Sequence, residues 1–251
     1  MFDDKRKDGP AWLGIGAQRS GTTWFTDLLL QHPQVTLSKK GLKELHLLYP
    51  SLERPVDAEA YRSLFPSDGC PGEWTPYYMR AAGCAETAAA LCRSNAPILV
   101  LLRDPIDRFV SAMRFYEQRR YVAGIGDRTR TRLLMGDAVW AGMYATQLAD
   151  WEHHFSRKRL IVLQYEAVRA SFADAVTAIW KRLGLDPIPV RPAPEPAPDR
   201  NTSRWAPSAQ MREALQRSYR GEVQKMRTKW GFDVSLWSNF VWTLCFFADV
   251  F

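Results

Sequence analysis

The chain has 251 residues, 46% of them hydrophobic and 24% charged, which is the composition of a globular protein with room for one domain and a sizeable core. Its formal net charge of +7 favours acidic ligands, although a basic surface without any ligand also explains it. Nucleic acid is not expected as a partner, because no zinc, helix-turn-helix or RNP pattern accompanies the basic residues.

The cysteines and the beginning of the sequence bear on the compartment. The four cysteines form neither a C-x-x-C pair nor a metal-binding spacing with the four histidines, so we expect unpaired thiols in a reducing compartment and no metal. The first residues, MFDDKRKDGPAW, are charged and lack the apolar region of a secretory signal. We therefore expect a cytoplasmic protein.

Strand and helix patterns alternate along the chain. Short apolar runs predict buried strands at residues 11–16, 98–102 and 160–164. Helical patterns begin at Thr22, where Pro33 marks the exit, and after Asp57, which is a candidate N-cap. Further helical patterns cover residues 106–118, 139–155, 171–184 and 207–230. This alternation predicts an α/β fold with a mainly parallel central sheet flanked by helices.

The last third of the chain contains two unusual segments. Residues 186–199, DPIPVRPAPEPAPD, hold six prolines and are expected to cross the surface in an extended form. Residues 237–251 are apolar, and too few to span a bilayer, which takes about 20 residues. This tail can dock on its own domain, on another subunit or at a membrane surface, and the oligomeric state stays open. We expect one domain over residues 1–251, with its core in about 11–235.

The stretch GAQRSGTTW, residues 16–24, joins the first predicted strand to the first predicted helix. Gly16 and Gly21 have the spacing of a G-x-x-x-x-G-K-[ST] phosphate loop, and the unpaired N–H groups at a helix start attract anions. The loop also has three hydroxyl donors, on Ser20, Thr22 and Thr23. Position 22 is threonine instead of lysine, and the nearest cation is Arg19.

The missing lysine limits what this loop can hold. A small-molecule kinase would need that lysine and a magnesium-binding aspartate after another strand, whereas Asp104 is crowded by Arg103 and Pro105. The loop therefore suits a 5′-phosphate whose outer group needs no metal. A sulfuryl group fits, because it carries one negative charge where a terminal phosphoryl group carries two. The alternative is a helix that is merely capped by Ser20 or Thr22.

The loop resembles the 5′-phosphosulfate loop of sulfotransferases, which use 3′-phosphoadenosine 5′-phosphosulfate (PAPS). The family's second motif is R-D-P with a serine eight residues after the arginine, and LLRDPIDRFVSAMRFY places Arg103 and Ser111 at this separation. The resemblance implies that both residues bind the 3′-phosphate, Arg103 through charge-assisted hydrogen bonds. It also implies a P-loop-like fold and transfer of a sulfuryl group to a hydroxyl group of a saccharide, lipid or small molecule, with no metal.

Further contacts with the donor follow from the same resemblance. Arg19 stands where many members have a lysine, and because arginine is a poor proton donor it is expected to stabilise the leaving phosphate electrostatically. Trp24 matches a tryptophan that stacks on adenine, or else it packs in the core. Arg204 lies in a stretch resembling the loop that closes over the cofactor. The full set of donor contacts is Gln18, Arg19, Ser20, Gly21, Thr22, Thr23, Trp24, Arg103, Ser111 and Arg204.

The stretch KKGLKELHLL, residues 39–48, resembles the K-E-x-H-F-F segment of heparan sulfate sulfotransferases, whose glutamate is the catalytic base. The resemblance makes Glu44 the expected base, which takes the proton of the acceptor hydroxyl group. His46 is the rival base. Lys43 is expected to hold the sulfate oxygens.

The acceptor itself is not fixed by the sequence. GEWTPYYM, residues 72–79, resembles a segment that lines the acceptor cleft, which implies that Glu73 and Tyr77 touch the substrate. Basic residues between 114 and 132 favour a polyanionic acceptor, whereas nearby aromatic residues favour a phenolic or apolar one. These aromatic residues are Trp74, Tyr77, Tyr78, Phe115, Tyr116 and Tyr121. A non-catalytic nucleotide-binding protein is the remaining alternative.

Overall fold

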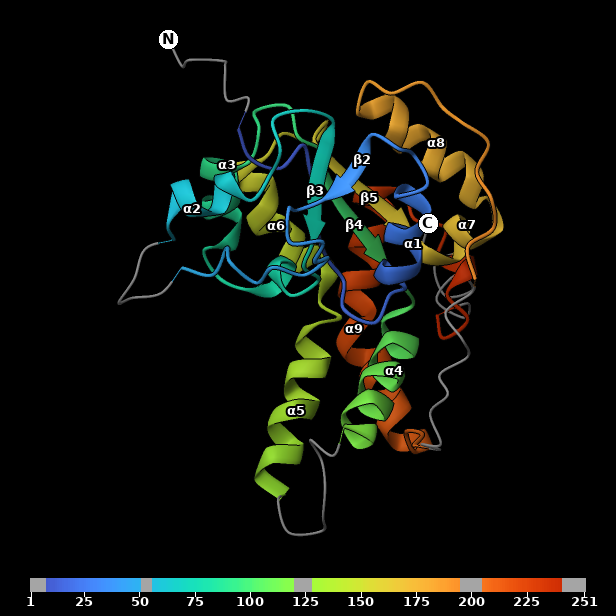
Figure 1. Ribbon diagram of the computed structural model, residues 1–251. Helices are drawn as coiled ribbons and strands as arrows, with labels where there is room; N and C mark the ends of the chain where they lie inside the picture. The colour runs from blue at the N-terminus through green and yellow to red at the C-terminus, as the bar shows by residue number, and fades with distance from the viewer. Residues whose placement is uncertain (1–7, 51–55, 120–127, 195–204, 241–251) are drawn as a thin grey trace.

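A central sheet with helices on both faces forms the body of the molecule (Figure 1). The computed structural model describes residues 8–50, 56–119, 128–194 and 205–240. Arg204, Tyr121 and the tail from residue 241 onward lie outside these described residues.

The sheet has five strands and confirms the predicted parallel α/β architecture. The strands are β1 (Trp12–Gly16), β2 (Val35–Leu37), β3 (Cys70–Trp74), β4 (Ile98–Leu102) and β5 (Leu160–Gln164). Their order is β2-β3-β1-β4-β5, and every neighbouring pair is parallel. All residues of β1 and β4 are buried, as expected for the centre of a parallel sheet covered on both faces.

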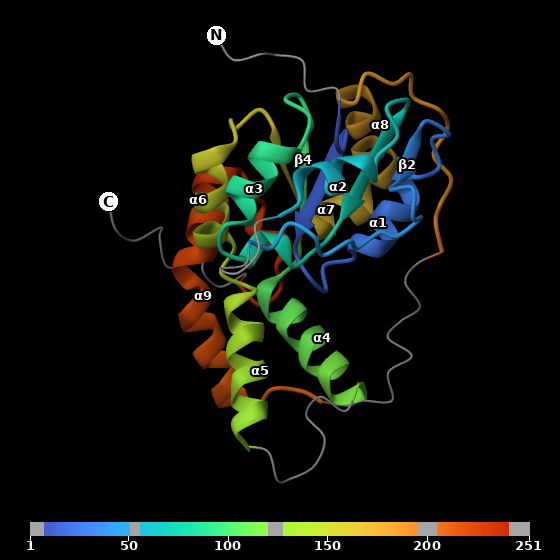
Figure 2. The ribbon, with the colours of Figure 1, turned by 60° about the vertical axis from the view of Figure 1, so that its left-hand side comes forward.

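Helices lie on both faces of the sheet and beyond its carboxyl edge (Figures 1 and 2). They are α1 (Thr22–Leu29), α2 (Ala58–Ser63), α3 (Cys84–Leu91), α4 (Pro105–Gln118), α5 (Arg128–Trp140), α6 (Tyr144–His154), α7 (Tyr165–Ala170), α8 (Phe172–Arg182) and α9 (Ala209–Trp230), with short 3₁₀ turns at Tyr78–Arg80 and Val234–Leu236. Figures 1 and 2 show α1 and α8 on one side and α3 and α6 on the other. Successive residues of β4 accordingly alternate between two core clusters, with Val100 in one and Leu101 in the other.

Several helix ends follow the predicted signals. The Asp57 carboxylate accepts a hydrogen bond from the Ala60 N–H at the start of α2, and Gly231 ends α9 in the left-handed conformation at φ 71°. The single helix predicted over residues 139–155 is wrong, because the chain breaks between α5 and α6. Gly142 lies in this break against Tyr219, and a Cβ there would be 2.7 Å from the tyrosine oxygen.

The beginning of the apolar tail packs on its own domain. Trp237 and Phe240 are completely buried in the larger core cluster. Within the described ranges, none of the helices has both the length and the apolar character needed to cross a membrane.

Candidate active site

The predicted site residues follow the carboxyl ends of the strands. Residues 17–21 follow β1, residues 38–49 follow β2, residues 75–77 follow β3, and Arg103 follows β4. Because all five strands are parallel, these segments meet at one edge of the sheet, where open α/β sheets hold their ligands. In Figure 1 the arrows of β3 and β4 point toward α4 and α5, which extend from this edge.

The phosphate loop presents the start of α1 without a side-chain cap. Gly21 is the N-cap at φ 84°, and neither Ser20 nor Thr22 caps the helix. The N–H groups of the first turn therefore have no acceptor within the helix and can bind an anion. A Cβ at Gly21 would lie 2.5 Å from the Tyr165 ring, so only glycine fits there. The Ser20 hydroxyl is buried and has no hydrogen-bond partner in the described part of the chain.

A lysine from another segment reaches this loop. The Lys43 Nζ donates hydrogen bonds to Thr22 Oγ1 at 3.2 Å and to Thr23 Oγ1 at 3.3 Å. Burial lowers the pKa of Lys43, and the nearby carboxylates of Glu44 and Asp27 partly oppose this shift. Lys43 thus supplies, from the segment after β2, a cation at the loop that lacks a lysine of its own.

The two candidate bases lie beside Lys43. One Glu44 oxygen is 2.9 Å from Lys43 Nζ, and the other is 3.4 Å from His46 Nε2. The second ring nitrogen of His46 lies 2.9 Å from the Tyr49 hydroxyl. Both side chains are substantially exposed, so either can be reached from solvent. Glu44 is the closer of the two to the phosphate loop, through its contact with Lys43.

Glu73 has a structural role beneath the segment that carries Lys43 and Glu44. Its side chain is completely buried and accepts hydrogen bonds from the hydroxyl groups of Tyr61 at 2.7 Å and Thr75 at 2.7 Å. It also accepts from the Tyr78 hydroxyl and from the Leu45 N–H, at 3.2 Å each. Burial raises the pKa of Glu73, although these donors oppose the shift. We expected Glu73 to touch the substrate, and this burial does not agree with that expectation. Glu73 instead holds the segment that carries Lys43 and Glu44.

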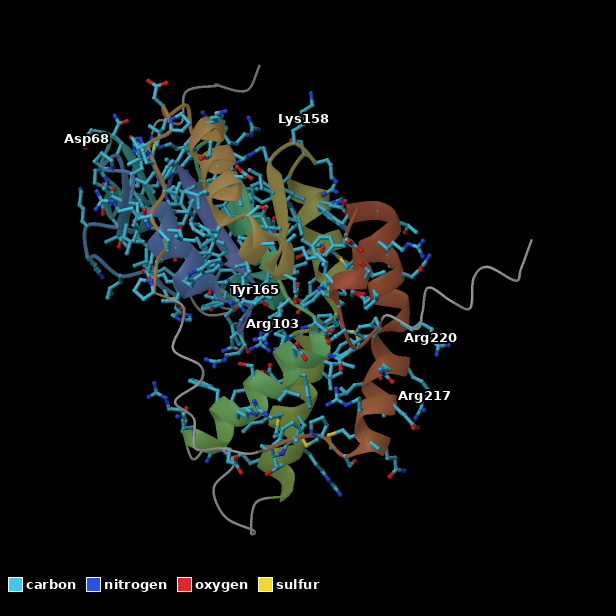
Figure 3. The ribbon with its side chains drawn as sticks, turned by 90° about the vertical axis from the view of Figure 1, so that its right-hand side faces the viewer. Asp68, Arg103, Lys158, Tyr165, Arg217 and Arg220 are labelled. Carbon is cyan, nitrogen blue, oxygen red and sulfur yellow. The ribbon has the colours of Figure 1, made fainter. Side chains whose placement is uncertain are left out.

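The second predicted anion pocket lies between the loop and α4. Arg19, which adopts a left-handed backbone at φ 68°, donates from Nε to Ser111 Oγ at 3.1 Å. Arg103 lies 5.5 Å from the centre of the Tyr165 ring and 3.8 Å from an Asp107 oxygen. Figure 3 shows Arg103 and Tyr165 together above α4. Asp107 is one turn before Ser111 on α4, so Arg103, which precedes the helix, contacts the side of α4 that carries Ser111.

Residues near the end of the described chain hold the first turn of α4, next to Arg103, and no local sequence pattern indicates them. Asp104 caps α4 and accepts two hydrogen bonds from Asn239, at 3.1 and 3.0 Å. Asn239 also donates to Asp107 at 3.0 Å. Glu166 accepts from the Asp104 N–H at 2.9 Å and from the Trp237 indole at 3.0 Å. The Asp104 carboxylate is therefore used within the protein and is not presented to a metal ion.

Two further expectations concern the nucleotide base and the closing loop. Trp24 is 7% exposed and packs edge-on against Tyr165 and Phe172, which supports core packing rather than stacking on adenine. Arg204 lies outside the described residues. The next residue, Trp205, contacts α4, where its carbonyl oxygen accepts a hydrogen bond from Arg114 at 3.0 Å.

The Arg80 side chain is buried and joins helix α5 to the phosphate loop, a role that no sequence pattern indicates. It forms an ion pair with Asp137 of α5 and donates to the Gln18 amide oxygen of the phosphate loop at 3.4 Å. Its guanidinium group also lies 3.8 Å from the centre of the Tyr77 ring. Arg80 therefore ties α5 to both the loop and the acceptor side, through residues 57 and 62 positions away along the chain.

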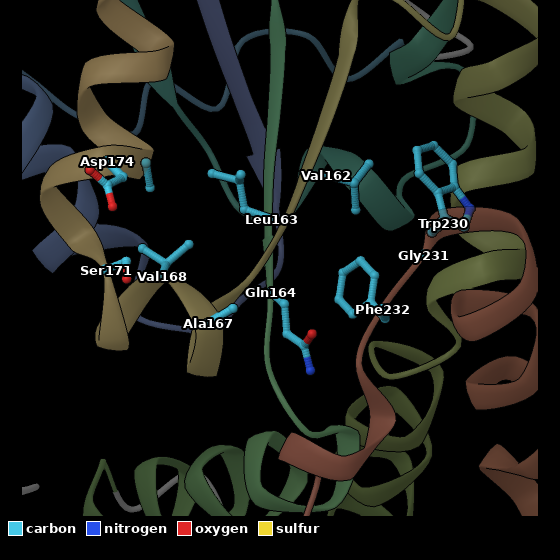
Figure 4. Close-up of a pocket in the computed structure, with 11 residues that line it drawn as sticks. Val162, Leu163, Gln164, Ala167, Val168, Ser171, Asp174, Trp230, Gly231 and Phe232 are labelled. Atoms are coloured by element: carbon cyan, nitrogen blue, oxygen red, sulfur yellow. The ribbon is translucent and has the colours of Figure 1, made fainter.

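A separate groove of about 360 Å³ follows the outer edge of β5 (Figure 4). Val162 and Leu163 of β5 lie in the middle of the groove, with Val168 and Ser171 on one side and Trp230 and Phe232 on the other. None of the predicted site residues lines this groove, so we do not assign it to the candidate active site.

The sequence matches a known protein family and several of its members. The model of the sulfotransferase domain family matches residues 11–192. Bifunctional heparan sulfate N-deacetylase/N-sulfotransferase 4 of Mus musculus is 25% identical over 198 residues, covering 71% of this chain and 22% of that protein. Heparan sulfate glucosamine 3-O-sulfotransferase 3A1 of Homo sapiens is 25% identical over 199 residues, covering 75% of this chain and 47% of that protein.

The fold also matches a solved structure. A sulfotransferase from Alicyclobacillus acidocaldarius superposes with a TM-score of 0.71 at 23% identity, covering 91% of this chain and 98% of that one. The match to the curated relatives is less complete, since the matched region spans about a fifth of the first relative and about half of the second.

Proposed function

The chain belongs to the sulfotransferase domain family, and from this membership and the site geometry we propose that it transfers a sulfuryl group from PAPS to a hydroxyl group of an acceptor. The observation that carries the proposal is the contact of Lys43 with both the phosphate loop and Glu44. This contact sets a candidate base next to the place where a 5′-phosphosulfate would lie.

The donor would bind along the sheet edge with its two anionic ends in separate pockets. The uncapped start of α1 suits the 5′-phosphosulfate, because backbone N–H groups and the helix dipole favour an anion there. The buried Ser20 hydroxyl, which lacks a partner among the described residues, provides a further donor. Arg103 and Ser111 would hold the 3′-phosphate at the other end.

Transfer then needs one proton acceptor and stabilisation of the leaving group. Glu44 takes the proton of the acceptor hydroxyl as its oxygen attacks sulfur, and a new oxygen–sulfur bond forms. The bond between sulfur and the bridging oxygen breaks, and that oxygen keeps the electron pair as part of the 5′-phosphate. Lys43, Arg19 and the loop N–H groups stabilise this charge while remaining protonated themselves.

The kinase alternative lacks a place for magnesium at the expected strand end. Asp104 is the carboxylate that follows β4, and its oxygens accept hydrogen bonds from Asn239 and from the first turn of α4. A metal would have to displace these bonds.

Turnover with a single substituted residue tests the proposal. The parent protein and Glu44→Gln are incubated with labelled PAPS and a panel of saccharide, phenolic and lipid alcohols, and PAP binding is measured by calorimetry. Glu44→Gln should lose about 10²- to 10⁴-fold in kcat while binding PAP as the parent does. PAP binding without turnover of any alcohol by the parent would instead support a non-catalytic nucleotide-binding protein.

A further inference from the structure

Exposed apolar side chains concentrate around the acceptor side of the site. In the part of the chain that the structure describes, seven large hydrophobic residues are prominently exposed. Five of them come from the segment after β2, the segment after β3 and helix α5: Leu42, Leu47, Tyr77, Leu133 and Trp140. Single exposed apolar residues need no explanation, but a group that borders a catalytic base does.

A chain of contacts joins this group to Glu44. His46 touches Glu44 and stacks on Tyr49, with ring centres 5.9 Å apart. Tyr49 packs edge-on against Tyr77 at 6.0 Å. The other contact of Tyr77 is Arg80, whose carbonyl oxygen is 3.5 Å from the Trp140 indole nitrogen. These contacts therefore connect the candidate base to Trp140, the last residue of α5.

Helix α5 extends the strip away from the sheet. Leu133 is 70% exposed and lies seven residues before Trp140, so both side chains project from the same side of the helix. Asp137, between them, faces the same way and pairs with Arg80. Seven residues span about 10 Å along a helix. We call the surface formed by Tyr77, Trp140 and Leu133 the apolar strip.

We propose that the acceptor is amphiphilic, with its hydroxyl group at Glu44 and an attached alkyl or aryl group lying along the apolar strip toward Leu133. The inference rests on the proposed sulfuryl transfer and names its acceptor class. The contacts that join Glu44 to Tyr77 through His46 and Tyr49 favour this occupant, because a molecule whose hydroxyl group lies at Glu44 has these aromatic rings beside it.

A wholly polar saccharide is the less suitable occupant. The Leu133 side chain offers no hydrogen bond, and the Trp140 indole nitrogen already donates to the Arg80 carbonyl oxygen. Sugar hydroxyl groups laid against these side chains would lose water without gaining partners. An alkyl or aryl group would gain free energy from the same contact, by roughly 25 cal/mol for each Å² removed from water.

Binding of a matched pair of glucosides tests the inference. Methyl glucoside and octyl glucoside, the latter kept below its micelle concentration, are titrated by calorimetry into the PAP-loaded full chain. We expect octyl glucoside to bind at least about tenfold tighter to the parent. Leu133→Ala and Trp140→Ala should each reduce this ratio severalfold, and Leu133 is so exposed that its replacement cannot disturb the core. Leu236→Ala, at another exposed leucine that lies outside the strip, should leave the ratio unchanged.

Other results would overturn the inference. Equal affinities for the two glucosides in the parent, or a chain-length effect that survives both strip variants, would mean that no apolar group lies there. Tight binding of a sulfated oligosaccharide that ignores these variants would point to a saccharide acceptor instead. Each outcome is read from binding, whereas failure of the proposed function would appear as a lack of PAP binding or of PAPS turnover.

Discussion

Replacing Glu73 by alanine should strongly destabilise the protein, although Glu73 touches no ligand in this account. Its carboxylate accepts hydrogen bonds from Tyr61, Thr75 and Tyr78 and from the Leu45 N–H, and all of its surface is buried. Glu73→Ala removes the acceptor from all four donors at once. The Tyr61 hydroxyl is also buried, so it has no direct access to bulk water once this partner is lost.

The magnitude follows from the donors that are left unpaired. A buried donor without an acceptor costs about 1–3 kcal/mol, so leaving two donors unpaired, the Tyr61 hydroxyl and the Leu45 N–H, gives about 2–6 kcal/mol. For a chain of this length each kcal/mol lowers Tm by about 2–4 °C, so we expect a decrease of roughly 5–20 °C. The Leu45 bond also holds Lys43 and Glu44 in place, and kcat should fall as well.

Thermal unfolding followed by circular dichroism measures this effect. Glu213→Ala is the matched control, because Glu213 is 68% exposed and its partner Arg217 is 3.8 Å away, and its Tm should change by no more than about 1–2 °C. A Tm for Glu73→Ala within 2 °C of the parent would refute the argument that Glu73 is a buried acceptor for this segment.

The same residue gives a pH dependence. Because burial raises the pKa of Glu73 above its ordinary value of 4.5, the unfolded chain loses this proton at a lower pH than the folded protein does. The contribution of the Glu73 proton to stability is complete below pH 4.5 and declines as pH rises through the raised pKa. Glutamine carries no such proton, so the Tm advantage of the parent over Glu73→Gln should be larger at acid pH than at pH of about 8. An advantage that grows with pH would contradict the sign.

Three substitutions test other parts of the site. Gly21→Ala places a Cβ 2.5 Å from the Tyr165 ring at a positive φ, so PAP affinity measured by calorimetry should fall by at least about tenfold, and an unchanged affinity would exclude the close approach. Because the pKa of Lys43 is lowered, kcat of the parent should decline at alkaline pH as this lysine loses its proton. Arginine keeps its charge there, so in Lys43→Arg the decline should move to higher pH. An unmoved profile would assign the decline to another group. Asn239→Ala removes a hydrogen-bond donor from Asp107, whose carboxylate lies beside Arg103. Binding of PAP, which has the 3′-phosphate, should weaken about 3- to 10-fold while binding of AMP is unaffected. Equal losses for both nucleotides would indicate general destabilisation.

The strands that carry the donor loops could be predicted because their signals are local. The runs at Trp12–Gly16, Ile98–Leu102 and Leu160–Gln164 are continuous apolar segments, and the first two lead into the donor residues at Gln18 and Arg103. Strand β3 was missed because it contains Pro71 and Gly72, which are unfavourable in strands. Gly72 is needed there, since a Cβ would lie 2.3 Å from the Trp12 ring.

The arrangement around the site depends on partners that lie far apart in sequence. Asn239 reaches Asp104 across 135 positions, and Arg80 reaches Asp137 across 57, so no short motif contains either pair. For Glu73 the sequence supplied a resemblance to an acceptor-lining segment but no information on burial. The contact of Lys43 with the loop hydroxyls is likewise tertiary, and it places the cation where the loop sequence has only Thr22.

Discrimination between PAP and AMP tests the central claim, that two separate anion pockets hold opposite ends of one nucleotide. Calorimetry compares the parent with Arg103→Ala/Ser111→Ala for both nucleotides, which differ in the 3′-phosphate. The parent should bind PAP more tightly, and the double variant should lose about 10- to 100-fold in that preference while keeping its affinity for AMP. A double variant that prefers PAP over AMP as strongly as the parent does would contradict the account.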